Sequence, residues 1–352
     1  MNPLTQTNRL FAPLFADPEV AKVFSTERLC AHFLAYEIAL TKGLGTSGSV
    51  DAALAQAATD AMKGFEADLG AIEAAAPVDG MAVPEFARQL KRHVGPELSP
   101  AVHIGGTSQD LIDTAMVLCL RDANTVLAGR MEAVCGTLDR LITEHGENKM
   151  MGRTRMQAAL PITVRHRLMS WHRPLEAHRA RLDDLRPALE VLQFGGATGD
   201  RSANGEFATK IGTVMAQHLD LCDPGYAWHT DRTLFADYAG WLARVAGSLG
   251  KIGQDICLMA QQGIDEVKQS GGGSSSAMAH KQNPVTAELL VSLAQFNAGQ
   301  LPLMHQSMIH EQERSGAAWS LEWMVLPAMV CTTGKALALA EAQLNAITHI
   351  GT

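Results

Sequence analysis

Aromatic side chains, positive charge and long apolar runs are all scarce in this chain of 352 residues. Its Lys and Arg residues number 29 against 37 Asp and Glu, which leaves a formal net charge of −8 at pH 7. Proteins that wrap nucleic acid or lie on anionic lipid usually carry the opposite balance. No stretch of 18 consecutive apolar residues occurs, so a membrane-spanning helix is not expected. We therefore expect neither a nucleic-acid partner nor a membrane partner.

Cysteine is present but follows no pattern. The six cysteines are scattered along the chain, with no C-x-x-C pair and no grouping with histidine at zinc-binding spacing. We interpret them as small buried side chains in a reducing compartment, and expect no metal site. The N-terminus lacks the basic-then-apolar order of a secretory signal, so the expected location is the cytoplasm.

Helical periodicity runs through most of the sequence. With only 5% aromatic residues and no alternating pattern of useful length, sheets are not favoured. Apolar residues at intervals of three and four, such as Phe33, Tyr36 and Leu40, predict amphipathic helices. The predicted fold class is therefore all-α. The predicted helices cover residues 26–42, 51–69, 84–93, 107–145, 162–192, 231–265, 284–313 and 317–347.

One predicted helix is far longer than the soluble average. Residues 107–145 contain no proline, and at 1.5 Å per residue they would span roughly 55–60 Å. Thr107 and Asp110 form a T-x-x-D start signal, because both side chains can accept hydrogen bonds from first-turn amides. We expect a short N-terminal helical domain over 1–98 and a domain of long bundled helices over 99–352.

Several long helices are apolar over a wide arc, and residues 234–252 show this most clearly. A single thin bundle would expose much of such an arc, so partner chains are expected to cover it and the protein is expected to be a homo-oligomer. The alternative is a monomer whose own helices bury everything.

Two segments match motifs but are more simply explained without chemistry. Residues 43–48, GLGTSG, fit the dinucleotide-binding fingerprint, yet a helix rather than a strand precedes them, so the glycines are expected to end that helix. His166, His172 and His178 lie six apart, which on a helix spreads them over different faces instead of converging on a metal.

The segment from Gly271 to Pro284 reads GGGSSSAMAHKQNP and carries the most informative chemistry. Composition alone suggests a flexible Gly/Ser linker. However, the segment lies between two long helices, and Lys281, Asn283 and Pro284 lead directly into the second one. Glycine amides, the Lys281 ammonium and the Asn283 amide can stabilise an oxyanion while a serine moves a proton. A mobile loop that closes over a carboxylate substrate is the preferred interpretation.

Three further polar clusters lie at predicted helix ends. His103, Thr107 and Ser108 precede the longest helix, whose N-terminus attracts anions, although a plain helix cap explains them equally well. Residues 152–157 (GRTRMQ) are expected to lead into the next helix, and residues 310–314 (HEQER) lie between the last two. Together these clusters supply cations and hydroxyls suited to a polycarboxylate ligand.

These clusters, in this order, make the chain resemble the fumarase/aspartase superfamily, whose signature loop is close to G-S-S-x-M-P-x-K-x-N-P. Its other two segments contain T-S-x-D and G-R-T-H. Within the superfamily the chain is most similar to the carboxymuconate cycloisomerase family, and the resemblance extends from Leu14 to about residue 345. Four segments carry it: 103–115 (HIGGTSQDLIDTA), 193–200 (QFGGATGD), 272–285 (GGSSSAMAHKQNPV) and 310–323 (HEQERSGAAWSLEW).

The resemblance implies a homotetramer whose central helices form a twenty-helix core, with each active site shared between chains and without a metal or organic cofactor. It implies a tricarboxylate substrate that cyclises to a lactone when one carboxylate adds to a double bond. Ser275 matches the serine that moves the proton, and Lys281 and Asn283 match the loop residues that hold the substrate carboxylate. Less specific matches to substrate-binding positions are His103, Thr107, Ser108, Thr154, Gln157 and Arg314.

Three departures from the superfamily pattern matter. Ala279 replaces the proline that follows the loop methionine, and the chain stops near residue 352, so the small C-terminal domain of relatives is expected to be absent. Arg155 replaces the G-R-T-H histidine, which lyases use on the leaving group. Lactonisation expels no leaving group, so this change favours a cycloisomerase in which Arg155 binds a carboxylate. The alternatives are a lyase acting on a succinyl-type substrate and a catalytically silent homologue.

Overall fold

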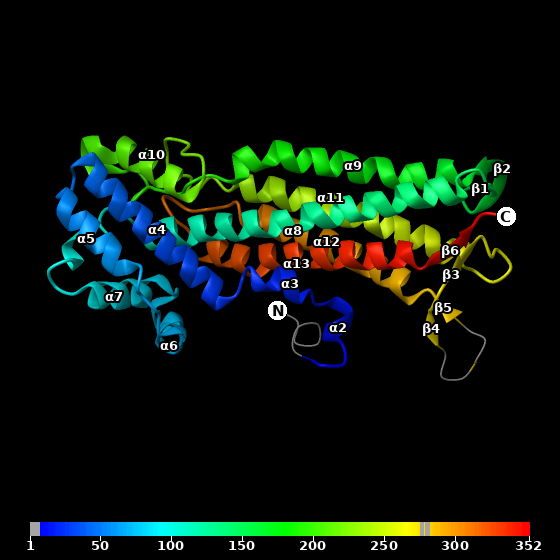
Figure 1. The fold of residues 1–352 in the computed structure, drawn as a ribbon, viewed down its shortest axis with the longest axis horizontal. Helices are drawn as coiled ribbons and strands as arrows, with labels where there is room; N and C mark the ends of the chain where they lie inside the picture. The colour runs from blue at the N-terminus through cyan, green and yellow to red at the C-terminus, as the bar shows by residue number, and fades with distance from the viewer. Residues whose placement is uncertain (1–7, 275–277, 279–281) are drawn as a thin grey trace.

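The computed structural model describes residues 8–274, 278 and 282–352, and long helices lying side by side dominate it (Figure 1). The prediction of an all-α fold with very long helices is confirmed. The bundle consists of α8 (Ser108–His145), α9 (Val164–Leu189), α11 (Thr233–Met259), α12 (Val285–Gln306) and α13 (Ala317–Asn345).

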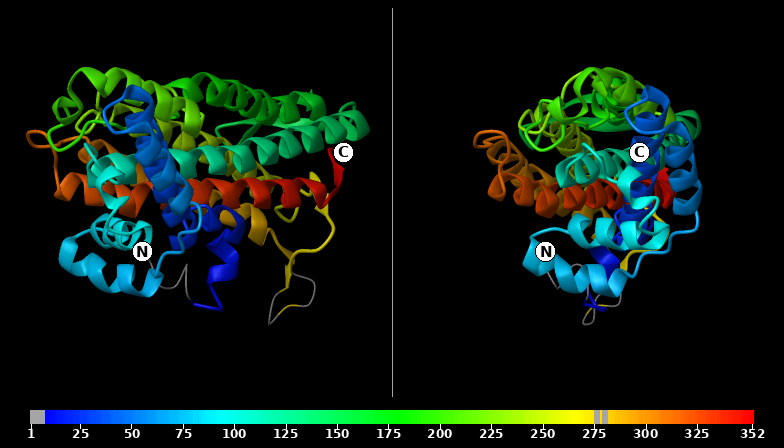
Figure 2. Two further views of the ribbon diagram at one scale, coloured as in Figure 1. Left: turned by 60° about the vertical axis from the view of Figure 1, so that its left-hand side comes forward. Right: turned by 90° about the vertical axis from the view of Figure 1, so that its left-hand side faces the viewer.

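Most of the shorter helices gather at one end of the bundle, away from the C-terminus, whereas the first two lie beside its middle (Figures 1 and 2). The predicted helix over 51–69 is wrong in length, because it ends at Met62. Gly48 ends the helix before it in a left-handed conformation, with φ 87°, so the GLGTSG segment is a helix end as predicted. The shorter elements are α2 (Ala12–Phe15), α3 (Pro18–Lys22), α4 (Thr26–Ser47), α5 (Ala52–Met62), α6 (Leu69–Asp79), α7 (Val83–Val94), α10 (Ala208–Leu219) and the 3₁₀ turns η1 (Ser99–Ala101) and η2 (Ser202–Phe207).

Two apolar cores hold these elements together. The larger one fills the long-helix bundle, and the smaller one joins α4, α5 and α7 to the start of α8. Residues 192–219, including α10, contribute Phe194, Ile211 and Met215 to the smaller core. A segment from the middle of the sequence therefore completes the core of the N-terminal helices, and the division at 98 and 99 stays a prediction.

The wide apolar arc of α11 is buried within one chain. Tyr238, Trp241, Leu242 and Leu249 all have 0% of their surface exposed, because α9, α12 and α13 pack around α11. The expectation that partner chains cover this arc is wrong: the fold surrounds α11 with the chain's own helices. The case for an oligomer must therefore rest on other features.

In the described part of the chain, three short two-stranded antiparallel ladders lie at the far end of the bundle, in segments without an alternating apolar pattern (Figure 1). The expectation that residues 152–157 lead directly into a helix is wrong, because they form the tip of a hairpin. Two-residue side-chain alternation is weak in such short, largely exposed strands. The pairs are β1 (Lys149–Thr154) with β2 (Gln157–Thr163), β3 (Val267–Gln269) with β6 (Ile347–Ile350), and β4 (Gly273–Ser274) with β5 (Gln282–Asn283).

Helix α13 has the length and apolarity of a membrane span, but 56% of that window is buried inside the protein. It packs against α8, α11 and α12, as the core helix of a soluble fold does. The cysteines are free, and Cys30, Cys119 and Cys135 are buried as expected. Cys222 is exposed, contrary to expectation, because it follows α10 in a surface loop.

Candidate active site

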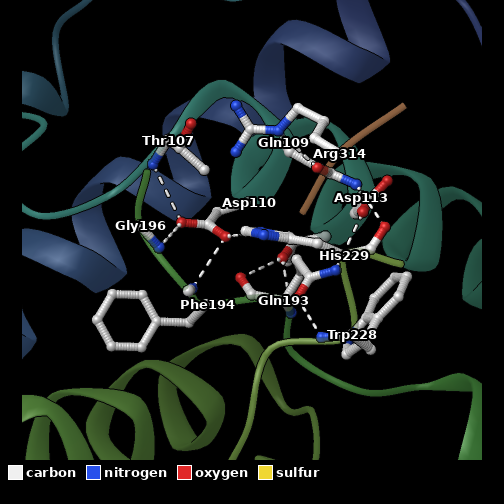
Figure 3. Close-up of polar contacts among 12 residues, drawn as sticks. Thr107, Gln109, Asp110, Asp113, Gln193, Phe194, Gly196, Trp228, His229 and Arg314 are labelled. Atoms are coloured by element: carbon white, nitrogen blue, oxygen red, sulfur yellow. Dashed lines mark hydrogen bonds and ion pairs between the residues drawn. The ribbon is translucent and has the colours of Figure 1, made fainter. Parts of the chain in front are cut away.

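The buried carboxylate of Asp110 organises the start of α8 (Figure 3). It accepts hydrogen bonds from the backbone amides of Thr107 at 3.0 Å and of Gly195 and Gly196 at 2.9 Å. The Nε2 of His229 lies 2.7 Å from the same carboxylate and donates a fourth. The predicted Thr107–Asp110 start signal is confirmed. Because its acceptor sites are occupied, Asp110 positions its neighbours and does not react itself.

The glycine-rich segment 193–200 is shaped for this contact. A Cβ at Gly195 would lie 2.5 Å from the Ala227 Cβ, which is closer than side chains approach. Gly196 has φ 75°, a conformation that favours glycine. These two glycines allow consecutive backbone amides to reach Asp110, which explains why this segment carries part of the family resemblance.

Arg314 reaches the same helix end from the loop between α12 and α13. Its Nε donates to Gln109 Oε1 at 2.7 Å, and its Nη2 donates to the carbonyl of Ala197 at 3.2 Å. The Gln109 amide in turn donates to the His229 carbonyl at 2.9 Å. The structure thus brings a fixed guanidinium to the N-terminus of α8, where Thr107 and Ser108 lie and where anions are favoured (Figure 3).

His103 lies just before this helix end and is held by Glu37 of α4. Its Nδ1 is 2.6 Å from Glu37 Oε1, and the Glu37 side chain has 0% of its surface exposed. Burial by itself lowers the pKa of His103, but the hydrogen bond to Glu37 and that residue's charge outweigh burial and raise it. His103 is therefore more readily protonated than a free histidine, and it adds a second basic group to this end of the bundle.

Thr154, Arg155 and Gln157 lie at the opposite end, in the β1–β2 hairpin. Thr154 pairs with Gln157, so Arg155 and Met156 form a two-residue turn with φ 49° and 66°. Both positive angles are those of a type I′ turn, and they leave the Arg155 side chain exposed. The neighbouring Arg153 instead forms an ion pair with Glu266.

Arg153 lies one residue before the end of β1, close to the turn, and forms a partly buried ion pair. Its Nη1 lies 2.7 Å from each oxygen of Glu266, whose side chain is 4% exposed. The same carboxylate also accepts from the backbone amide of Met151 at 3.2 Å. Of the two arginines in the G-R-T-R segment, Arg153 is therefore engaged by Glu266, whereas Arg155 is exposed.

Asn283 lies at the base of the glycine-rich loop, also at this end of the bundle. It pairs with Gly273, and Gln282 pairs with Ser274, so a short ladder closes the loop at its base. This stem distinguishes the segment from a freely extended linker. Ser275 and Lys281 lie outside the described residues; in the sequence Ser275 directly follows β4 and Lys281 directly precedes β5.

The residues named for the site therefore form two clusters at opposite ends of one chain (Figure 1). The first contains His103, Thr107, Ser108 and Arg314; the second contains Thr154, Arg155, Gln157 and Asn283. Helix α8 alone has 38 residues between them, which at 1.5 Å per residue is about 57 Å. No small molecule can touch both clusters of the same chain.

Sequence reasoning missed Glu37, Gln109 and His229. A signal for Glu37 exists, because it lies on the same helical face as the buried Phe33 and Leu40, where a carboxylate needs a partner. His229 lies in an irregular loop, so no periodicity marks its burial.

The chain is similar to two bacterial proteins over nearly its whole length. It is 34% identical to a 3-carboxy-cis,cis-muconate cycloisomerase of Pseudomonas putida, over 95% of this chain and 81% of the relative. It is 36% identical to the protein of that name from Pseudomonas aeruginosa, over 94% of this chain and 73% of the relative.

The fold matches solved structures equally well. The 3-carboxy-cis,cis-muconate lactonizing enzyme from Pseudomonas putida superposes with a TM-score of 0.89 at 34% identity, over 97% of this chain and 77% of that one. A family model described as a lyase matches residues 16–297. With this match across most of the sequence, the chain belongs to that lyase family, within the fumarase/aspartase superfamily.

Proposed function

We propose that the protein converts 3-carboxy-cis,cis-muconate to a carboxymuconolactone. The observation that carries this function is the 34% and 36% identity, over about 95% of the chain, to two relatives named as cycloisomerases for that compound. The two cation-bearing clusters suit a substrate with three carboxylates. The free cysteines fit a reducing compartment, and we place the enzyme in the cytoplasm.

Each active site is assembled from more than one chain of a homotetramer. The separation of about 57 Å along α8 supports this arrangement, because the two clusters can meet only when the α8 start of one protomer faces the hairpin end of another. In such a site His103, Thr107, Ser108 and Arg314 come from one chain. Thr154, Arg155, Gln157 and the glycine-rich loop come from its partners.

The reaction needs one new bond and one proton. A substrate carboxylate adds to the conjugated double bond of the same molecule, which forms the C–O bond of the lactone and breaks the C=C π bond. Electron density moves onto the carboxylate at the other alkene carbon. Lys281, Asn283 and loop amides stabilise this developing dianion, and Ser275 delivers a proton to the adjacent carbon. No group leaves the substrate.

Arg155 binds one of the three carboxylates in this scheme. Its position at the tip of an exposed turn lets the guanidinium extend from the hairpin into a partner's site. A guanidinium remains charged at any physiological pH and binds carboxylate in a two-pronged fashion, but it is a poor proton donor. Arg155 is thus suited to holding an anion and unsuited to assisting a leaving group, which disfavours the lyase alternative.

The direct test is to add the purified protein to 3-carboxy-cis,cis-muconate and follow the loss of the diene's ultraviolet absorbance. We expect rapid loss with a lactone as the sole product, and Ser275→Ala should abolish it without changing the oligomer's mass. Turnover of a succinyl-type substrate with release of fumarate, and none of the muconate, would establish the lyase alternative. No turnover of either by a folded protein would indicate a silent homologue.

A further inference from the structure

Three metal-ligating side chains meet on the bundle, between the two polar clusters. Cys135 of α8 faces His172 and Glu176 of the neighbouring α9, and one potential ligand atom of each lies within 4.8 Å of the other two. The cysteine is 37 residues from the histidine in sequence, so no local motif announces the group. Only the packing of α8 against α9 brings these residues together.

The spacing within each helix places the side chains on one face. His172 and Glu176 are four residues apart on α9, and Cys135 is four residues from Asp139 on α8. The Oδ1 of Asp139 lies 3.3 Å from His172 Nε2. The two helices thus present a thiol, an imidazole and one carboxylate to one another, and the Asp139 carboxylate lies beside the imidazole.

The imidazole of His172 has an unsatisfied polar atom. Its Nε2 is buried and lacks a hydrogen-bond partner among the described residues, although Asp139 Oδ1 lies 3.3 Å away. Buried polar atoms are usually paired with protein, water or an ion.

The group is unsuited to the other familiar use of cysteine beside histidine, nucleophilic catalysis. Cys135 is 4% exposed, so a substrate carbon cannot approach its sulfur. Arg179 donates to Glu176 Oε2 at 3.0 Å and so orients this carboxylate, as an outer-shell partner does at a metal site.

We propose that Cys135, His172 and Glu176 bind a zinc ion that ties α8 to α9, with a water molecule as the fourth ligand. The ligand types are those of tetrahedral zinc, which accepts sulfur, nitrogen and carboxylate oxygen together. The ion enters from the side of Asp139, whose side chain is 68% exposed. The site is structural, and it is independent of the proposed function because it involves none of the residues assigned to the reaction.

The test uses the full chain, freed of metal with a chelator and then titrated with zinc against a chromophoric competitor. We expect about one zinc ion per chain and a higher melting temperature with zinc than without. Replacing zinc with cobalt should give the charge-transfer absorption of a cobalt–thiolate bond. Both Cys135→Ser and His172→Gln should remove that absorption or weaken zinc binding by about 100-fold or more.

Matched controls come from the same chain. Cys257→Ser changes another partly buried thiol, and His166→Gln changes an exposed histidine of α9; both should bind zinc as the unaltered protein does. His172→Gln keeps the test decisive if Cys135→Ser does not fold. The proposal is overturned if the folded protein takes up no zinc, or if zinc binds with equal affinity to both site variants and cobalt shows no thiolate absorption.

Discussion

The pair of His103 and Glu37 makes a prediction at the scale of single residues. Because Glu37 raises the pKa of His103 above its usual value near 6.5, their pairing stabilises the fold fully below about pH 6.5. That stabilisation is lost as the pH rises through the higher folded-state pKa. Urea unfolding should therefore show a cost of about 1.5–3 kcal/mol for Glu37→Gln near pH 6, and a smaller cost near pH 9.

Glu132→Gln, which changes an exposed carboxylate on α8, is the control for this experiment and should cost little at either pH. An equal cost of Glu37→Gln at both pH values would show that the carboxylate does not hold a protonated imidazole. A larger cost at the higher pH would reverse the sign that the geometry requires.

Arg155 gives a second prediction for a single side chain. Asparagine tolerates the left-handed conformation of this turn, so Arg155→Asn removes the charge while keeping the hairpin. We expect KM for the muconate to rise about 10-fold or more, with the free energy of unfolding nearly unchanged. Steady-state kinetics would detect the change in KM. The control is Arg165→Gln, which removes an exposed cation at the start of α9. An unchanged KM would remove Arg155 from the site.

At the scale of single residues, the sequence predicted contacts between side chains that lie close together along the chain. The Thr107–Asp110 start signal depends on residues three apart, and it was predicted correctly. The partners of Asp110 were not, because Gly195, Gly196 and His229 lie 85 to 119 residues away. Pairings across such distances depend on how helices pack, which a single sequence does not reveal.

Among the elements, one buried ion-pair network ties three helices together. Arg232, at the start of α11, is 1% exposed and donates to Asp113 of α8 at 2.7 and 3.0 Å and to Glu322 of α13 at 2.8 and 2.6 Å. Burial raises the pKa of Glu322 to about 7, despite the opposing effect of Arg232. The charge and hydrogen bonds of Arg232 therefore favour the ionised form of Glu322 and offset part of the cost of burying two carboxylates.

Removing that arginine should be among the most damaging single changes. We expect Arg232→Met to lower the free energy of unfolding by about 3–5 kcal/mol at neutral pH, because two buried carboxylates lose their partner. Denaturant unfolding measures this. Arg181→Met, which breaks an exposed pair with Asp184 at 3.7 Å, should cost about 0–1 kcal/mol. Equal costs would mean that the network contributes no more than a surface pair.

The elements themselves were predicted unevenly, for a physical reason. Long helices such as α8 repeat their apolar pattern over many turns, so their existence and length follow from the sequence. The β1–β2 hairpin could not be predicted in this way, because its strands are short and its second strand is largely exposed. With neither face buried, the strand has no need for alternating apolar and polar residues.

At the scale of the whole molecule, the expected oligomer is better supported by function than by burial. The apolar arc of α11 was expected to need partner chains, and the chain's own helices bury it instead. The argument for an oligomer rests on the candidate site. One chain cannot complete that site, because its two clusters are separated by the length of α8. An assembly in which protomers lie antiparallel would join the clusters at each end.

The most direct measurement is complementation between two inactive variants. Ser275→Ala removes the proposed proton carrier, and Arg314→Ala removes the guanidinium proposed to bind a substrate carboxylate near the start of α8. Each variant alone should be inactive on the muconate, and mixed oligomers formed by co-expression should regain activity, because some sites then draw both ends from unaltered chains. Mixed oligomers that stay inactive, while co-expressed wild-type chains under the same two tags are active, would contradict a site shared between chains.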